Sequence, residues 1–333
     1  MVFSLRQAAI TVQVLCICIS IATGFTGDLK RPGSDMDFSV GRPASWSLQE
    51  ASGDRPSDRI SSGLVADASN VSSADIVNTF SVICAPNNIV RELSGTTTGC
   101  RTCPKGSGFQ NEQNMQWDLK HALSGHFTSS KEDDIILSTQ GCEPHAMNFG
   151  GTFVFVRDHD RLRFLTYNES LITERCHKLV VGEGLDTLVC QAAWGSQGYM
   201  KSFIYQVVFD KQGSGKTSPI FETSDSTLTC GEDIEEKRVG PVQQSKIQSV
   251  HFGERDTRVP SLSIVATLGH KELTQTERDT CKESLKKSNY QEVSISIPTA
   301  QYRINFSFDG REFKAAPSND ATLKLFLIPE LPK

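Results

Sequence analysis

The 333-residue sequence lacks the short patterns that most often mark an enzyme active site. It contains no Gly-x-Ser-x-Gly string for acyl transfer and no His-Glu-x-x-His string for a zinc hydrolase. Residues 211–219 partly resemble a phosphate-binding loop, but Asp210 stands where the first glycine of that pattern belongs. No second Cys-x-x-Cys pair accompanies Cys100 and Cys103, as a structural zinc site would need. We therefore expect no metal and no cofactor.

A dense stripe of basic side chains is also missing. The 34 Lys and Arg residues are outnumbered by 39 Asp and Glu residues, which gives a formal net charge of −5. A nucleic-acid-binding protein needs a basic surface to contact phosphates, so we expect no nucleic-acid partner. The hydrophobic fraction of 38% is ordinary for a globular protein, and the length allows one large or two ordinary domains.

The apolar run at the N-terminus is too short for a membrane span. Residues 1–7 carry one Arg and no acid, residues 8–22 are almost wholly apolar, and small residues follow at 22–24. This order is typical of an export signal over residues 1–24. A spanning helix needs about 20 apolar residues, so we expect no span in the mature chain. The sequence predicts a secreted or periplasmic protein, with an uncleaved membrane anchor as the alternative.

Cysteine usage supports the same compartment. Two of the ten cysteines lie within the predicted signal, which leaves eight. An even number of cysteines in an exported chain predicts disulfide bonds, although the sequence does not determine their pairing. The disulfide candidates are Cys84, Cys100, Cys103, Cys142, Cys176, Cys190, Cys230 and Cys281.

The remaining chain divides by composition. Residues 25–79 are rich in Ser, Gly, Pro and Asp without a sustained period, which predicts a disordered linker that serves as a spacer or a tether. Residues 80–116 form a cysteine-containing segment. From 117 to 333, apolar runs alternate with turn residues, which predicts a β domain. The best helix signal lies at 274–289, with a Thr cap, early acids and late lysines, and predicts a surface helix in an insertion near 270–290.

The β domain contains a repeated four-strand pattern. Each of three units has a strand ending in a Gly-containing loop, an apolar strand, a third strand ending in an Asp-containing turn, and a short fourth strand. The loops at Gly125 and Gly182 are 57 residues apart, and those at Gly182 and Gly253 are 71 apart. Such repeats are typical of propeller blades. We therefore predict an all-β fold of antiparallel, propeller-like repeats.

These units resemble the FG-GAP class of β-propeller repeat found in secreted bacterial proteins. The resemblance lies in Gly125-His126-Phe127, Asp133-Asp134-Ile135, Gly151-Thr152 and Phe155, and in their counterparts in the other units. The loops lack the alternating Asp and Asn of the family's calcium site, so calcium binding is not carried over. Propellers typically close with about 4–8 blades, so three units predict an incomplete array or a compact irregular β domain.

Two polar, glycine-rich loops form the candidate ligand-binding site. The string GCEPHAMNFGG at 141–151 connects the second and third strands of unit one, and AAWGSQG at 192–198 is its counterpart in unit two. Equivalent loops of a repeat array gather on one face, where ligands usually bind. Alternatively, the glycines permit a turn, Cys142 forms a disulfide, and the polar groups satisfy the backbone. The predicted ligand-binding residues are Glu143, His145, Asn148, Trp194 and Gln197.

The function that these features favour is non-catalytic. We expect an exported binding or scaffolding protein whose partner is a cell-envelope carbohydrate or protein. The alternative is a secreted hydrolase that acts on carbohydrate or cell-wall material through a pair of carboxylates. No spacing in the sequence singles out such a pair among Glu143, Asp158, Asp160 and Glu183. A third possibility is a partner protein that acts mainly through residues 25–75.

Overall fold

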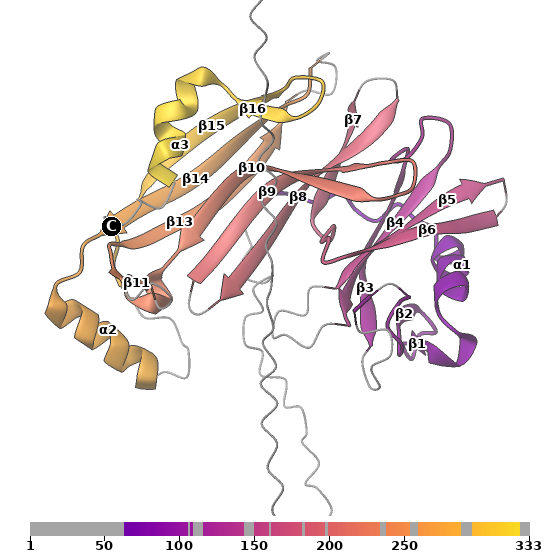
Figure 1. Ribbon diagram of the computed structural model, residues 1–333, viewed down its shortest axis with the longest axis horizontal. Coiled ribbons are helices and arrows are strands. Elements are labelled where there is room, and N and C mark those ends of the chain that lie inside the picture. Colours follow the sequence, from indigo (N-terminus) through magenta and orange to yellow (C-terminus); the bar gives the residue numbers. More distant parts are fainter. Residues whose placement is uncertain are drawn as a thin grey trace, which may run out of the picture. The chain divides into compact units, whose positions relative to one another are not determined.

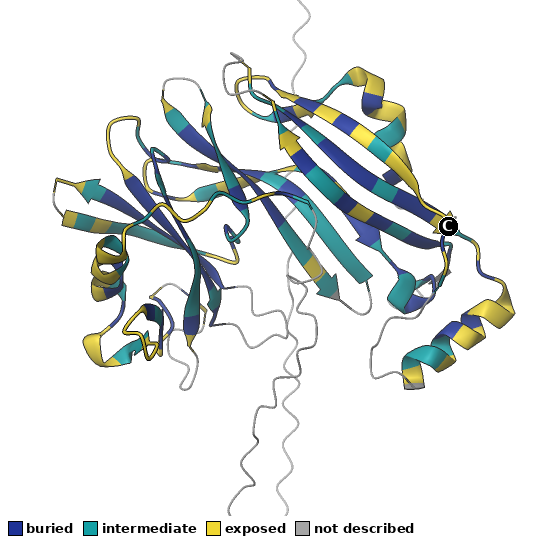
Figure 2. Cartoon of the chain, turned by 180° about the vertical axis from the view of Figure 1, so that it is seen from behind, coloured by how far each residue is buried: buried dark blue, intermediate teal, exposed yellow. Residues whose placement is uncertain are grey.

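The computed structural model describes residues 63–105, 107–108, 116–142, 150–159, 161–181, 184–196, 199–233, 238–253, 259–287 and 295–326. The fold is mostly antiparallel β, as the sequence predicts, and its strands form two large sheets and a two-stranded ribbon (Figure 1). In the described part of the chain, the strands form neither a closed barrel nor a closed propeller. Figure 2 shows that buried residues follow the strands, whereas exposed residues concentrate on helices and turns.

The six-stranded sheet contains the first expected unit. Its strands are β1 (Ile89–Arg91), β2 (Thr97–Cys100), β3 (Trp117–Gly125), β4 (Asp134–Gly141), β5 (Gly151–Asp158) and β6 (Arg161–Glu169). They are hydrogen-bonded in the order β1-β2-β3-β4-β5-β6, and neighbouring strands are antiparallel. The expected unit corresponds to β3–β6, and β1 and β2 extend the sheet into the cysteine-containing segment.

The eight-stranded sheet contains the second and third units. Its strands are β7 (Cys176–Val181), β8 (Leu185–Ser196), β9 (Tyr199–Phe209), β10 (Gly215–Asp225), β13 (Val242–Phe252), β14 (Ser261–Lys271), β15 (Ala300–Phe308) and β16 (Phe313–Ala315). Unit two is the meander β7–β10 and unit three is the meander β13–β16. The two meanders are joined at one registered pair, Asp225 of β10 and Gln244 of β13.

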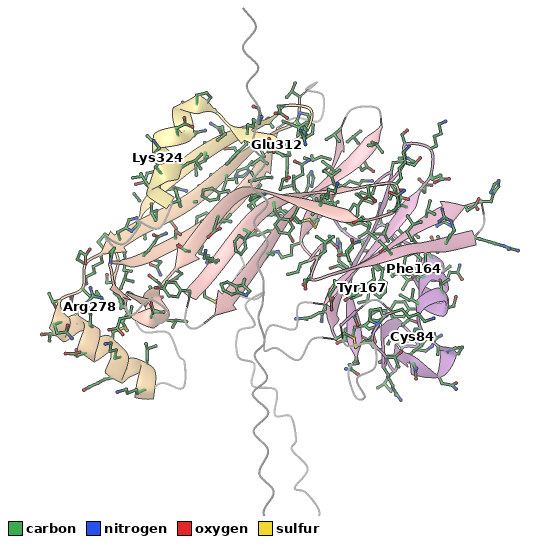
Figure 3. The ribbon with its side chains drawn as sticks, in the orientation of Figure 1. Cys84, Phe164, Tyr167, Arg278, Glu312 and Lys324 are labelled. Carbon is green, nitrogen blue, oxygen red and sulfur yellow. A yellow bond between two sulfur atoms is a disulfide. The ribbon has the colours of Figure 1, made fainter. Side chains whose placement is uncertain are left out.

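Helix α1 (Ser73–Ile83) covers unit one. Phe80 of α1 packs on Trp117 of β3, and Trp117 packs on Phe153 of β5, with ring centroids 5.0 and 5.1 Å apart. Phe164 and Tyr167 of β6 pack against the same cluster, and Figure 3 shows them on the side of the sheet that carries α1. The first unit therefore has its own core beneath α1.

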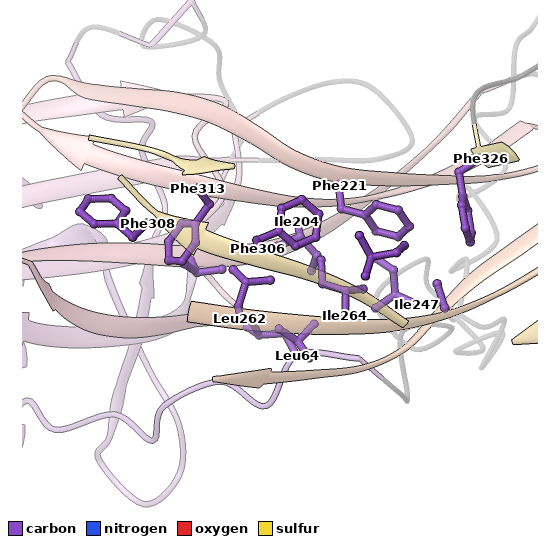
Figure 4. Close-up of a cluster of buried hydrophobic side chains, with 14 of the residues drawn as sticks. Leu64, Ile204, Phe221, Ile247, Leu262, Ile264, Phe306, Phe308, Phe313 and Phe326 are labelled. Carbon is purple, nitrogen blue, oxygen red and sulfur yellow. The ribbon is translucent and has the colours of Figure 1, made fainter. Parts of the chain in front are cut away.

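Consecutive units share cores. Leu123, Ile136 and Val154 of unit one are buried in one cluster with Leu188 and Val207 of unit two. Another cluster joins unit two to unit three (Figure 4). Its members include Val189, Ile204, Phe221, Leu262, Ile264 and Phe306. Strands β7, β8 and β9 of unit two contribute to both cores because successive side chains of a strand point to opposite faces, whereas β10 contributes only to the core with unit three.

The far side of unit three is polar. Along β15, buried and exposed residues alternate, with Ile304 and Phe306 inward and Arg303 and Asn305 exposed. Unit one ends under α1 and unit three ends in this polar face.

Two of the three helices in the described residues were not expected. Helix α2 (Gln275–Lys287) occupies the predicted position, and Thr274 and Glu277 form its capping box through Glu277 N to Thr274 Oγ1 (3.3 Å) and Thr274 N to Glu277 Oε2 (2.9 Å). Helices α1 and α3 (Asp320–Phe326) are additional. Three 3₁₀ turns, η2 (Pro86–Asn88), η3 (Thr227–Thr229) and η4 (Pro317–Asn319), and the ribbon β11 (Glu232–Asp233) and β12 (Arg238–Val239) complete the elements.

The packed part of the chain begins before residue 80. Helix α1 starts inside the expected linker, where the Ser72 hydroxyl caps it by accepting a hydrogen bond from the Asp75 amide (3.1 Å). Leu64 is buried in the core between units two and three, and its amide donates to the Gln191 side chain (2.7 Å). Residues 25–62 of the expected linker lie outside the described residues.

All eight expected cysteines form disulfides, which confirms that prediction. Cys100 and Cys103 belong to different bridges, so the Cys-x-x-Cys pair is not itself a disulfide. The bridges attach α1 to β2, β7 to β8, and α2 to the turn after η3. The four pairs are Cys84–Cys100, Cys103–Cys142, Cys176–Cys190 and Cys230–Cys281. No helix among the described residues is long and apolar enough to cross a membrane.

Candidate functional site

An open groove of about 520 Å³ lies on one face of β8, β9 and β10. Its floor includes Trp194, Phe203, Tyr205 and Pro219, and the loop 170–172 forms one wall. The strand register explains this grouping. Ala192, two residues before Trp194, pairs with Phe203, and Tyr205 pairs with Pro219, so these side chains share a face.

The groove continues the core between units one and two. Leu188 and Cys190 precede Ala192 and Trp194 on the same face of β8, and both are fully buried against unit one. Further along the strand this cover ends, and Trp194 is 38% exposed. The aromatic floor is therefore the part of the inter-unit face that the described residues of unit one do not cover.

The wall of the groove is attached to both units. The Ser170 amide donates to the Gly150 carbonyl (2.9 Å), and the Thr152 hydroxyl donates to the Leu171 carbonyl (2.5 Å). From the other side, the Tyr205 hydroxyl donates to the Ile172 carbonyl. Burial raises the pKa of Tyr205, which keeps the phenol in its protonated, donating form. These bonds hold the groove in a preformed shape.

One predicted site residue, Trp194, lies in this groove. The other four, Glu143, His145, Asn148 and Gln197, lie outside the described residues. The described end of the first loop, Gly150, borders the groove because its carbonyl accepts the Ser170 amide.

The ends of the first loop also carry features of a turn. Cys142 forms its disulfide with Cys103, as the structural interpretation of this loop expects. Gly141 and Gly150 have φ values of 123° and 72°. That left-handed region favours glycine because it has no Cβ. Both ends of the string at 141–151 therefore have structural roles.

Sequence patterns did not identify Phe203, Tyr205 and Pro219 as site residues. In β9, Phe203 and Tyr205 flank Ile204, which is fully buried in the core between units two and three. Both faces of the strand are thus apolar, and alternation cannot tell the covered face from the open one.

A second, polar pocket of about 200 Å³ lies between α1, β3 and β7. Its titratable side chains lie close to partners: Arg157 Nη2 is 2.8 Å from Asp75 Oδ1, and His126 Nε2 is 3.6 Å from Asp133 Oδ1. Burial alone would raise the pKa of Asp75, but hydrogen bonds from Arg157 and Ser72 outweigh it and lower that pKa. The carboxylate is therefore held as an ion, the partner of Arg157.

The loop at residues 127–134, which the sequence pattern likened to the FG-GAP calcium loop, is held together by hydrogen bonds within the loop. The buried Asp134 carboxylate accepts hydrogen bonds from the amides of Phe127 (2.7 Å) and Thr128 (2.6 Å) and from the Thr128 hydroxyl (3.0 Å). Burial raises the pKa of Asp134 despite these bonds. Among the described residues, no group of three or more His, Cys, Asp or Glu could hold a metal ion.

Comparison of the chain with protein-family models, with curated proteins and with solved structures finds no match.

Proposed function

We propose that this chain is an exported, non-catalytic binding protein whose ligand occupies the groove beside Trp194. The observation that carries the proposal is a partly exposed aromatic floor, with Trp194 38% exposed, next to the part of the same sheet face that is buried against unit one. Ligand pockets are typically about 300–1,000 Å³, mainly apolar and largely preformed, and this groove of about 520 Å³ has those properties.

Export is supported by the covalent structure. All eight cysteines outside the predicted signal are paired. Disulfides form and persist in oxidising compartments such as the periplasm and the extracellular space. The N-terminal export signal and the disulfides thus favour the same location.

The hydrolase is the second candidate, because Asp75 and Asp133 both line the polar pocket. Glycoside hydrolysis needs one carboxyl group with a raised pKa that acts as general acid. The pKa of Asp75 is instead lowered by its bond to Arg157. A carboxylate held as an ion does not donate a proton near neutral pH, so we favour the binding function.

The propeller-like arrangement is part of the same proposal. Three consecutive four-stranded meanders, each packed on the next, support an open array of blades. In such an array the ligand groove lies where two neighbouring blades diverge. The FG-GAP-like pattern of the sequence supports the same assignment.

The proposal is tested by replacing the exposed floor residue. We expect Trp194→Ala to weaken binding of the ligand by about tenfold or more, because truncating a central aromatic side chain commonly has that effect. Calorimetric titration with soluble oligosaccharides, peptidoglycan fragments, apolar peptides and neutral aromatic compounds measures it. The matched control is Val208→Ala, which truncates an exposed side chain of the neighbouring strand β9 outside the groove.

Folding is measured on the same variants. Trp194→Ala should retain the wild-type melting temperature more closely than Val154→Ala, which removes part of a fully buried side chain. If Trp194→Ala unfolds the protein as much as Val154→Ala does, Trp194 has a structural role. Binding that is equally strong in the wild type and in Trp194→Ala would contradict the proposal.

A further inference from the structure

The groove beside Trp194 presents apolar surface and few groups for hydrogen bonds. The Tyr205 hydroxyl is already bonded to the Ile172 carbonyl. The backbone of the floor is paired within the sheet, since β8, β9 and β10 are adjacent strands. In the described lining, the groups that can form hydrogen bonds with a ligand are the hydroxyls of Ser170 and Thr217 and the indole N–H of Trp194.

The described lining also carries no charge. Two charged residues follow the floor on the same face of the sheet: Lys201 pairs in register with Trp194, and Glu222 pairs with Phe203. These two side chains neutralise one another, with Lys201 Nζ 2.7 Å from Glu222 Oε1. By charge complementarity, an uncharged lining favours an uncharged ligand, because a charged group would lose its water without gaining a partner.

A carbohydrate is poorly matched to this chemistry. A sugar has hydroxyl groups around most of its ring, and each one that enters the groove gives up hydrogen bonds to water. A hydrophobic ring has no hydrogen bonds to water to lose. It gains the contact area of Trp194, Phe203 and Tyr205, and flat rings also pack favourably against aromatic side chains.

We infer that the ligand class is a neutral, ring-containing hydrophobic small molecule with at most a few hydroxyl or carbonyl groups. Its ring system lies over Trp194 and Phe203. Its polar group lies at the mouth of the groove, by the hydroxyls of Ser170 and Thr217. This inference rests on the proposed binding function and narrows it to one chemical class.

The test compares two fluorescent probes that share an arylated naphthylamine. N-phenyl-1-naphthylamine is neutral, and 1-anilinonaphthalene-8-sulfonate carries an added sulfonate. With the chain from which residues 1–24 have been removed, we expect saturable binding of the neutral probe and roughly tenfold weaker binding of the sulfonate. Trp194→Ala should weaken binding of the neutral probe by about tenfold or more.

Two control variants locate the probe. Val208→Ala and Val180→Ala truncate side chains that are 44% and 68% exposed and lie outside the groove, and neither should change the affinity. Phe203→Ala removes the second aromatic ring of the floor and should also weaken binding of the neutral probe. If Phe203→Ala fails to fold, Trp194→Ala decides alone, since its side chain is exposed.

The outcomes separate this inference from the binding function. Cellohexaose and chitohexaose are titrated in parallel. Suppose that either sugar binds the wild type and not Trp194→Ala, while the neutral probe shows no Trp194-dependent binding. That result overturns the ligand class and supports the binding function. Neutral-probe binding that is unchanged in Trp194→Ala, or stronger binding of the sulfonate, also overturns the ligand class. If no probe or sugar binds in a Trp194-dependent way, both proposals fail.

Discussion

Tyr205 has two roles at the scale of a single residue. Its ring belongs to the groove floor, and its hydroxyl holds the loop 170–172 through the Ile172 carbonyl. Trp194, in contrast, is 38% exposed. In the proposed binding mode a ligand would contact Trp194 directly, whereas Tyr205 also fixes the position of the groove wall through its hydrogen bond.

Replacing Tyr205 by Phe should lower the free energy of unfolding by about 1 kcal/mol at pH 7, because the Ile172 carbonyl loses its donor. Burial raises the pKa of Tyr205 above 10.0, the value for an exposed tyrosine. A group with a raised folded pKa contributes its stability below the unfolded pKa, and that contribution is lost as the pH rises further. Wild-type stability should thus fall above about pH 10, and less steeply in Tyr205→Phe.

Urea denaturation of both proteins between about pH 7 and 11 measures this difference. Below about pH 10, the free energy of unfolding of Tyr205→Phe should vary with pH in parallel with that of the wild type. If both proteins lose stability equally above about pH 10, the buried phenol of Tyr205 is not the cause of the loss.

At the scale of an element, α2 depends on polar and covalent attachments. Its single cysteine joins it to the turn after η3 through Cys230–Cys281. The guanidinium of Arg278, which Figure 3 labels on α2, donates to the Cys230 carbonyl (3.0 Å) and the Gly240 carbonyl (3.2 Å). Arg278 is only 6% exposed. The helix is thus held by groups that hydrophobic periodicity does not detect.

We expect Arg278→Ala to destabilise α2 by about 2 kcal/mol or more, because two carbonyl groups lose a charged donor. The effect should be local, since the Cys230–Cys281 bridge still holds the helix. Hydrogen exchange of the α2 amides measures it, with Lys286→Ala on the exposed side of the same helix as the control. Equal exchange rates in the two variants would show that Arg278 does not hold the helix.

At the scale of the whole molecule, each unit buries a face against the next. The cluster between units one and two includes Val154 and Leu188, and the cluster between units two and three includes Ile204 and Ile264. Unit two contributes to both, so losing either neighbour exposes one of its apolar faces. Because both cores contain residues of unit two, the described β structure should unfold as one cooperative unit.

To measure this cooperativity, the fluorescence of a tryptophan in unit one reports unfolding while a substitution destabilises unit three. In a background with Trp46 and Trp194 replaced by Phe, the buried Trp117 is the single remaining tryptophan. Ile264→Ala should cost about 2–5 kcal/mol and should shift the transitions monitored by Trp117 fluorescence and by far-UV circular dichroism equally. Separate transitions for the two signals would contradict the shared cores.

The sequence predicted those features that depend on neighbours a few residues away. Apolar alternation and turn residues located the strands of the three meanders, and the cap at Thr274 located α2. Helix α1 was missed because its cap, Ser72, follows a long stretch rich in Ser, Asp and Gly. The number of cysteines and the export signal predicted disulfides without their partners.

The sequence by itself determined the mostly antiparallel β class of the fold. It also selected Trp194 as a site residue, but it placed Trp194 in a loop, whereas the structure has this residue in strand β8. Only the tertiary structure decided which cysteines pair, which face of β9 is covered, and how Phe203 and Tyr205 join Trp194. The reason is physical. Local conformation follows from short-range sterics and periodicity, whereas burial is decided by chain segments that are distant in sequence and meet only in the fold.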